Sequence, residues 1–345
     1  MRSVDNVHTS KILNQRKHRK NHPAMLKILL TVVAVAVHQC TSARISEPYD
    51  DGVCGRSSFQ IKANIKRNRI TGGHEANPHS HPWIVFIQYG EQKCGGVILP
   101  TADKNSSNVL LTAAHCLKHL LTAVMPTKPL VTLITKEDLK NGTVIAGAHD
   151  LGRLDEEGRQ NGKVKQVILA DGGAKNDIAL IILENSFVFN DYVKSPCLSQ
   201  NNYLPPRTKC LVSGWGAIEG GVYRQISKLQ NVSLTHLTHV PPLQMPTRLM
   251  ESGVKRHSDY FCEYAMGPAF DYEVHICAGQ EKGRKGVNNH DSGGPLICYD
   301  HNLWTLYGIT KGRTFVHPSR PSLFMKIASY AQFIRGRTGI EWWPY

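Results

Sequence analysis

The sequence predicts an all-β protein, either a sandwich or a barrel. Short runs rich in β-branched and aromatic residues alternate with glycine, proline and asparagine, a pattern typical of strands joined by turns. These runs are residues 83–89, 97–99, 109–112, 179–183, 211–214 and 303–309. Helical signal is confined to short pieces and to residues 327–335, and the sequence contains no internal repeat.

Length and composition are those of a globular protein. The 345 residues are 41% hydrophobic and 20% charged, enough to bury one large core or two smaller ones. The net charge of +14 raises the question of a nucleic-acid partner. However, nine of these charges fall within residues 1–69, and no dense basic run interleaved with aromatic residues follows. We therefore expect no nucleic-acid partner.

The first 43 residues have the features of a secretory signal peptide. An apolar run at residues 28–37 follows a basic stretch, and small residues precede a cleavage position after Ala43. The run is shorter than the roughly 20 apolar residues that span a bilayer, although an uncleaved anchor is an alternative. Met25 begins a better-proportioned signal peptide and is an alternative start. The sequence thus predicts a secreted, extracellular protein without membrane attachment after cleavage.

Cysteine and asparagine patterns agree with secretion. Nine cysteines are an awkward number for an oxidising compartment, but Cys40 lies in the predicted signal peptide and eight remain. N-x-S/T triplets offer glycosylation sites at Asn105, Asn141 and Asn231. Residues 44–69 contain a single cysteine and end in a basic run, which predicts a pro-segment.

Three short motifs supply the groups that a serine nucleophile needs. A catalytic serine requires a base to take its proton, and usually a carboxylate to fix the tautomer of that base. His115 follows the expected strand at 109–112, and Asp177 precedes the one at 179–183. Ser292 lies in a glycine-rich bend where backbone N–H groups can converge on a carbonyl oxygen. These residues are the candidate catalytic groups.

The motifs and their order resemble those of the chymotrypsin/trypsin family of serine proteases. The matching stretches are Ile-Thr-Gly-Gly at 70–73, Cys-Gly-Gly at 94–96, Thr-Ala-Ala-His-Cys at 112–116, Asn-Asp-Ile-Ala-Leu at 176–180, Ser-Gly-Trp-Gly at 213–216 and Asp-Ser-Gly-Gly-Pro at 291–295. The resemblance implies two six-stranded antiparallel β-barrels, with the active site in the cleft between them and a short C-terminal helix. It assigns residues 70–345 to the protease domain.

The resemblance also implies a role for each catalytic residue. His115 acts as general base and then acid, Asp177 orients it, and Ser292 forms an acyl-enzyme. The backbone N–H groups of His290 and Ser292 form the oxyanion hole. Most active members carry glycine at the position of His290, so this residue is expected to reduce activity.

A zymogen switch follows from the same resemblance. A trypsin-like protease cuts after Arg69, and the new amino group of Ile70 inserts and pairs with Asp291. A buried ammonium and carboxylate are costly unless paired, so this pair can act as a two-state element that orders the oxyanion loop. The expected product is an active enzyme whose new N-terminus is buried.

Four disulfides are implied by the resemblance. They are Cys54–Cys197, Cys94–Cys116, Cys210–Cys298 and Cys262–Cys277. The first would keep the pro-segment attached after cleavage and give a two-chain enzyme.

The specificity pocket departs from that of trypsin. Gly286 replaces the aspartate that gives trypsin its preference for lysine and arginine, and Ser322 stands where a pocket glycine is usual. Residues 310–312 match the strand that pairs with extended substrate. We expect a small or medium uncharged side chain, rather than lysine or arginine, before the scissile bond.

The leading hypothesis is a monomeric secreted serine endopeptidase that acts on proteins or peptides and needs neither cofactor nor metal. A catalytically silent homologue that binds or regulates other proteins is the alternative, motivated by His290 and by the altered substrate strand. A third hypothesis is a carbohydrate- or lipid-binding protein that only shares the scaffold, since sites and not folds determine function.

Overall fold

The computed structural model describes most of the chain beyond residue 53. The described residues are 54–61, 73–117, 142–170, 175–199, 202–217, 245–279, 287, 290–312 and 321–338. Residues 51–345 form one compact unit. Several predicted features lie outside the described residues: the signal peptide, Arg69, Ile70, Asn141, Asn231 and Gly286.

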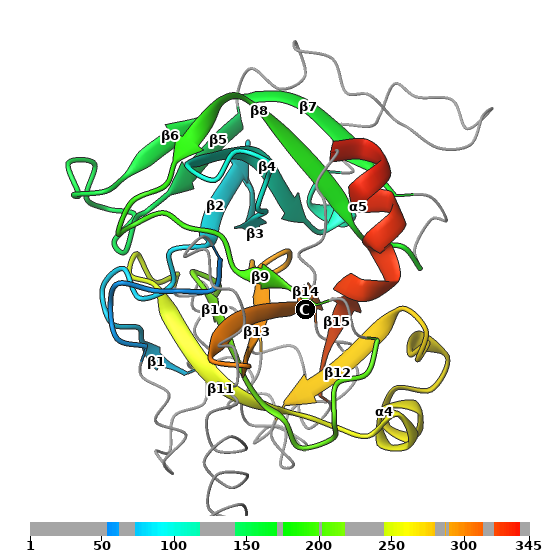
Figure 1. Cartoon of the computed structure of the whole chain (residues 1–345). Helices are drawn as coiled ribbons and strands as arrows, with labels where there is room; N and C mark the ends of the chain where they lie inside the picture. Colours follow the sequence, from blue (N-terminus) through cyan, green and yellow to red (C-terminus); the bar gives the residue numbers. More distant parts are fainter. Residues whose placement is uncertain are drawn as a thin grey trace, which may run out of the picture. The chain divides into compact units, whose positions relative to one another are not determined.

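One antiparallel sheet contains seven strands within the described residues, shown at the top of Figure 1. Its strands are β2 (Ile84–Tyr89), β3 (Gln92–Ile98), β4 (Ser106–Thr112), β5 (Gly142–Ala146), β6 (Gln160–Gly162), β7 (Val164–Leu169) and β8 (Ala179–Val188). They are ordered β6-β5-β2-β3-β4-β8-β7. Apolar side chains such as Ile87, Leu110 and Ile181 fill the interior of the curved sheet.

The other sheet contains β1 (His74–Glu75), β9 (Cys197–Leu198), β10 (Lys209–Gly214), β11 (Met250–Arg256), β12 (His275–Gly279), β13 (Pro295–Asp300), β14 (Leu303–Gly312) and β15 (Ser322–Lys326). The order β11-β10-β13-β14-β15-β12 closes on itself because β12 also pairs with β11. A closed barrel leaves no exposed edge among these strands. β1 and β9 are added at its margins.

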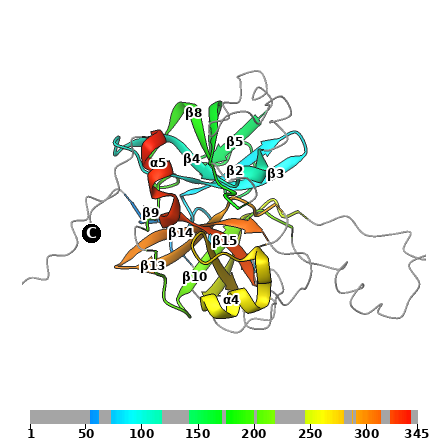
Figure 2. The same ribbon diagram turned by 90° about the vertical axis from the view of Figure 1, so that its right-hand side faces the viewer.

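The two sheets share a hydrophobic core. Leu111 and Leu180 of the first sheet and Ile309 of the second belong to one buried cluster, to which Ile334 of helix α5 (Ala331–Thr338) also belongs. Figure 2 shows α5 beside the sheets and helix α4 (Asp259–Met266) at the outer side of the second. Short 3-10 turns complete the described fold: η1 (Ala114–Cys116), η4 (Gly267–Ala269) and η5 (Ile327–Tyr330).

The predicted fold class is confirmed. Each expected run lies in a strand or overlaps one, and the expected C-terminal helix begins as η5 and continues as α5. The first sheet differs in detail, because β6 gives it a seventh strand among the described residues. No helix in the described part of the chain is long and apolar enough to cross a membrane.

Residues 54–61 of the predicted pro-segment lie against the second sheet. Cys54 forms a disulfide with Cys197, and the Trp304 N–H donates a hydrogen bond of 2.9 Å to the Gly55 carbonyl. Gly55 has φ of +69°, and a Cβ there would lie 2.8 Å from the Trp304 carbonyl oxygen, so this contact requires glycine. Ile61 packs on the shared core. This segment is therefore part of the folded unit.

Candidate active site

His115 and Asp177 meet because their strands pair. His115 lies in η1 directly after β4, and Asp177 lies two residues before β8. β4 and β8 are antiparallel neighbours, with Thr112 opposite Ala179. The Asp177 carboxylate accepts two hydrogen bonds from His115, one from ring Nδ1 at 2.6 Å and one from the backbone N–H at 2.7 Å. One carboxylate thus fixes both the ring and the backbone of the histidine.

The surroundings of Asp177 keep its carboxylate ionised. Burial raises the pKa of Asp177, whose exposed fraction is only 5%, but the hydrogen bonds and charge of His115 outweigh this effect, and the pKa lies below its usual value. An ionised carboxylate accepts the Nδ1 proton. In a neutral His115 ring, Nε2 then carries a lone pair and can accept a proton from a nucleophile.

The loop that carries Ser292 is hydrogen-bonded to both sheets. The Gly95 N–H of β3 donates to the Ser292 carbonyl at 2.8 Å, and the Gly293 N–H donates to the Thr310 carbonyl of β14 at 2.8 Å. Gly293 has φ of +81°, and a Cβ there would lie 2.2 Å from Thr112 Oγ1. The tight turn at Gly293 therefore lets the loop that carries Ser292 approach the end of β4, shortly before His115.

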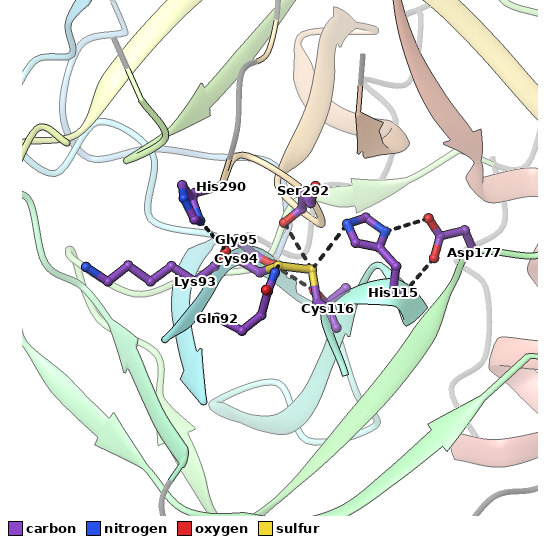
Figure 3. The surroundings of a disulfide bond; sticks show 10 residues. Gln92, Lys93, Cys94, Gly95, His115, Cys116, Asp177, His290 and Ser292 are labelled. Carbon is purple, nitrogen blue, oxygen red and sulfur yellow. Dashed lines mark hydrogen bonds and ion pairs between the residues drawn. A yellow bond between two sulfur atoms is a disulfide. The ribbon is translucent and has the colours of Figure 1, made fainter. Parts of the chain in front are cut away.

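The three candidate catalytic residues lie together, with the His115 ring between Ser292 and Asp177 (Figure 3). Cys116 Sγ lies 3.9 Å from His115 Nε2 and 3.8 Å from the Ser292 carbonyl oxygen. The Ser292 hydroxyl makes no hydrogen bond to a described residue. In free enzymes such catalytic hydrogen bonds are often long and tighten only around substrate.

The four disulfides of the structure are the four that the resemblance implied: Cys54–Cys197, Cys94–Cys116, Cys210–Cys298 and Cys262–Cys277. Cys94, His115 and Cys116 form the one cluster of three potential metal ligands found among the described residues. Because the two sulfur atoms are bonded to each other, they offer no thiolate to a metal. The cluster is thus a disulfide packed against a histidine.

His290 takes a backbone conformation that usually requires glycine. Its φ is +71°, in the left-handed region that non-glycine residues seldom adopt. The ring is held in place by Nδ1, which lies 3.2 Å from the Lys93 carbonyl oxygen of β3. Within the described residues, neither the His290 nor the Ser292 backbone N–H donates a hydrogen bond.

Asp291 is held by the Ser-Gly-Trp-Gly stretch at 213–216. Its Oδ1 accepts a hydrogen bond of 2.8 Å from the Gly216 N–H. A Cβ at Gly214 would lie 2.2 Å from the same oxygen, so the close approach of the carboxylate depends on glycine. Ile70, its predicted partner after activation, lies outside the described residues.

Ser322, the described residue of the predicted specificity pocket, is buried. This residue is 1% exposed, and its hydroxyl accepts a hydrogen bond of 3.1 Å from the Val287 N–H. The hydroxyl therefore ties β15 to Val287, the residue that follows Gly286 in the sequence. Asn105, a predicted glycosylation site, is exposed just before β4.

A buried histidine that did not stand out in the sequence contacts Lys311, a residue of the predicted substrate strand. His275 of β12 is 2% exposed, and its Nε2 lies 3.2 Å from Nζ of Lys311 on β14. The other ring nitrogen, Nδ1, accepts a hydrogen bond of 3.0 Å from the Asp271 N–H. Burial, followed by the charge of Lys311, lowers the pKa of His275 to about 4. His275 is therefore neutral near pH 7.

We expect the buried His275 to make the folded state less stable in acid. The unfolded chain takes up the proton near its ordinary pKa of about 6.5, whereas the folded chain does so only near pH 4. The contribution of this residue is therefore full above about pH 6.5, and about 2–3 kcal/mol is lost as the pH falls to about 4. Urea unfolding of the wild type and of His275→Gln, from pH 7 to pH 4, measures the difference. If the free energy of unfolding fell equally with pH in the two proteins, the assignment would be wrong.

Comparison with known proteins agrees with this geometry. The family model described as Trypsin matches residues 70–334, more than half of the chain. A solved structure of neuropsin, a serine protease expressed in the limbic system of mouse brain, is 28% identical, with a TM-score of 0.54, and the match covers 76% of this chain and 97% of neuropsin. A structure of GrC, at 24% identity, covers the same shares with a TM-score of 0.55 and supports the fold alone. The chain therefore belongs to the trypsin family of serine proteases.

Proposed function

We propose that this protein is a secreted serine endopeptidase, made as a zymogen, that hydrolyses peptide bonds of protein substrates through an acyl-enzyme. The observation that carries the proposal is the pair of hydrogen bonds, 2.6 and 2.7 Å long, by which the buried Asp177 holds His115 beside Ser292. A serine, a histidine and an aspartate in this arrangement have the residue types needed for acyl transfer, and the carboxylate orients the histidine that would act as base.

The reaction begins when His115 Nε2 takes the proton of the Ser292 hydroxyl. The freed Oγ attacks the peptide carbonyl carbon, and the N–H groups of His290 and Ser292 stabilise the charge that develops on the carbonyl oxygen. His115 then gives its proton to the departing amine, which leaves an acyl-enzyme. Water repeats the sequence with His115 as base and releases the acid. Asp177 keeps the Nδ1 proton in place throughout.

Activation is proposed to follow a cut between Arg69 and Ile70 by a trypsin-like protease. The freed amino group would pair with Asp291, whose carboxylate is positioned by the Gly216 N–H. After the cut, residues 54–61 would stay bound through the Cys54–Cys197 disulfide. The mature enzyme would then be a two-chain monomer.

Secretion and substrate preference complete the proposal. Four disulfides are typical of proteins that fold in an oxidising compartment, which supports an extracellular location after removal of residues 1–43. Gly286 and Ser322 favour a small or medium uncharged side chain before the scissile bond. Asn105, which is exposed, would carry a glycan, as would Asn141 and Asn231.

A silent homologue that binds other proteins is the second candidate function. The left-handed backbone of His290 is the observation that favours it, because its ring fills a place that most active members leave to glycine. The loss of one oxyanion donor costs about 10²- to 10³-fold in rate. The intact His115–Asp177 contact favours activity over this alternative.

Labelling with a fluorophosphonate tests the proposal directly. The protein, expressed from Met25, is labelled before and after trypsin cuts at Arg69, with Ser292→Ala as the control. We expect a label that requires the cut and is absent from the control. A correctly cut protein with Ile70 at its new N-terminus that takes up no label would favour the silent homologue.

A further inference from the structure

The segment that leads into β8 makes a tight turn at Asp177. The Ile178 N–H donates a hydrogen bond of 2.9 Å to the Asn176 carbonyl, so the bond closes across Asp177 alone. A hydrogen bond between residues two positions apart forms a γ-turn of three residues. Ile178 is buried, and its carbonyl accepts the Ala170 N–H at 3.1 Å. One side of the turn is therefore fixed by the sheet and the core, and the other depends on how Asn176 is held.

Tyr330 of η5 holds the side chain of Asn176. Its hydroxyl donates a hydrogen bond of 2.9 Å to Asn176 Oδ1, across 154 positions of the chain. The tyrosine is 6% exposed and belongs to the same buried cluster as Ile178. One tyrosine is thus hydrogen-bonded to the residue before Asp177 and shares a core cluster with the residue after it.

The Tyr330 hydroxyl is a donor that keeps its proton. Burial, followed by the charges of Asp177 and Asp271, raises the pKa of Tyr330 above its ordinary value. A tyrosine with its ordinary pKa of about 10 is already neutral near pH 7, so this hydroxyl can donate wherever His115 can act as a base. The charge of Asp177 contributes to the shift, so the hydroxyl lies within electrostatic reach of that carboxylate.

The hydrogen bond from Tyr330 also joins the two sheets beside the catalytic residues. Tyr330 ends η5, which directly follows β15 of the second sheet, whereas Asn176 and Asp177 lead into β8 of the first. Ser292 precedes β13, which belongs to the second sheet. The bond therefore fixes the turn that carries Asp177 relative to the sheet that follows the nucleophile.

We propose that Tyr330 is a positioning residue: through Asn176 it holds the Asp177 carboxylate where that group meets the catalytic histidine. The inference rests on the proposed protease function and deepens it, because it names two further side chains on which the geometry of the base depends. The two hydrogen bonds from His115 to this carboxylate are 2.6 and 2.7 Å long, so a displaced carboxylate would lengthen both. A displacement of about 1 Å at an active site can cost about 10²-fold in rate.

Tyr330→Phe tests the inference, because it removes the hydroxyl and keeps the ring in the core. In the full chain cut at Arg69, we expect kcat on a peptide substrate to fall about tenfold with KM unchanged, since the change affects the base and leaves the contacts with substrate in place. Asn176→Ala should give a similar loss. The double variant should lose little more than either single variant, because both changes remove the same hydrogen bond.

Tyr307→Phe is the matched control. Tyr307 is also 6% exposed, and its hydroxyl donates a hydrogen bond of 2.6 Å to Asp300 Oδ2, but it belongs to a different core cluster. The loss of a buried tyrosine hydroxyl should lower the melting temperature of both variants, whereas the loss of positioning should lower kcat only for Tyr330→Phe. If kcat fell equally in the two variants, the inference would be wrong.

The proton NMR signal of His115 Nδ1–H separates this inference from the proposed function, because it requires no turnover. A proton in a short hydrogen bond to a carboxylate resonates at low field, so the signal of the uncut full chain reports the contact with Asp177. We expect it to move to higher field or to broaden in Tyr330→Phe and to stay in place in Tyr307→Phe. If it does so in a protein that hydrolyses no peptide after the cut, the proposed function fails and the role of Tyr330 in placing Asp177 stands. An unchanged signal in Tyr330→Phe would overturn that role.

Discussion

Asp177→Asn is expected to lower kcat/KM by about 10⁴-fold while leaving the fold intact, the size of effect known for serine-histidine-aspartate sites. The carboxylate accepts from both Nδ1 and the backbone N–H of His115. An amide can present its NH₂ group to Nδ1 instead, which favours the tautomer with the proton on Nε2. That nitrogen could then no longer take the proton of Ser292.

The measurement is kcat/KM on a peptide substrate, together with the melting temperature of each variant. Asp155→Asn is the matched control, because this aspartate is exposed and stands in none of the catalytic motifs, so the change should leave both quantities unchanged. A variant at Asp177 that melts like the wild type and retains more than about a tenth of its rate would exclude the proposed role of the carboxylate.

Gly214→Ala is expected to lower the rate although Gly214 is not one of the catalytic residues. The added Cβ would lie 2.2 Å from Asp291 Oδ1, so the carboxylate has to move and lose the hydrogen bond from the Gly216 N–H. Asp291 precedes the nucleophile, and a displacement of about 1 Å there can cost about 10²-fold in rate. Overpacking of this kind also costs about 1–3 kcal/mol of stability. The lower rate and the lower stability should both appear in the protein cut at Arg69.

A double-mutant cycle identifies the cause. If the clash with the carboxylate is responsible, Gly214→Ala should cost much less free energy of unfolding in an Asp291→Ala background, because the colliding oxygen is gone. Gly152→Ala serves as the control, since its nearest neighbour would be an aspartate oxygen at 3.2 Å and its φ is not positive. If the free-energy costs of Gly214→Ala and Asp291→Ala were additive, the steric explanation would be wrong.

The sequence by itself determined the fold class and predicted the candidate catalytic residues. The signals that predict strands are local, because the alternation of apolar and polar residues follows from the geometry of the strand itself. His115, Asp177 and Ser292 each stand in a short motif whose neighbours build the local turn or strand end. The close approaches at Gly214 and Gly293, two glycines of those motifs, were seen only in the folded chain.

Only the tertiary structure brought together residues that no motif connects. His275 and Lys311 lie 36 positions apart, and their contact depends on β12 and β14 both pairing with β15. The buried pair of His81 and Glu251, 2.6 Å apart, spans 170 positions. Such contacts depend on strand register, where a shift of one residue turns every side chain to the other face. Pairing between distant strands fixes that register, so the contact between His275 and Lys311 became visible only in the folded chain.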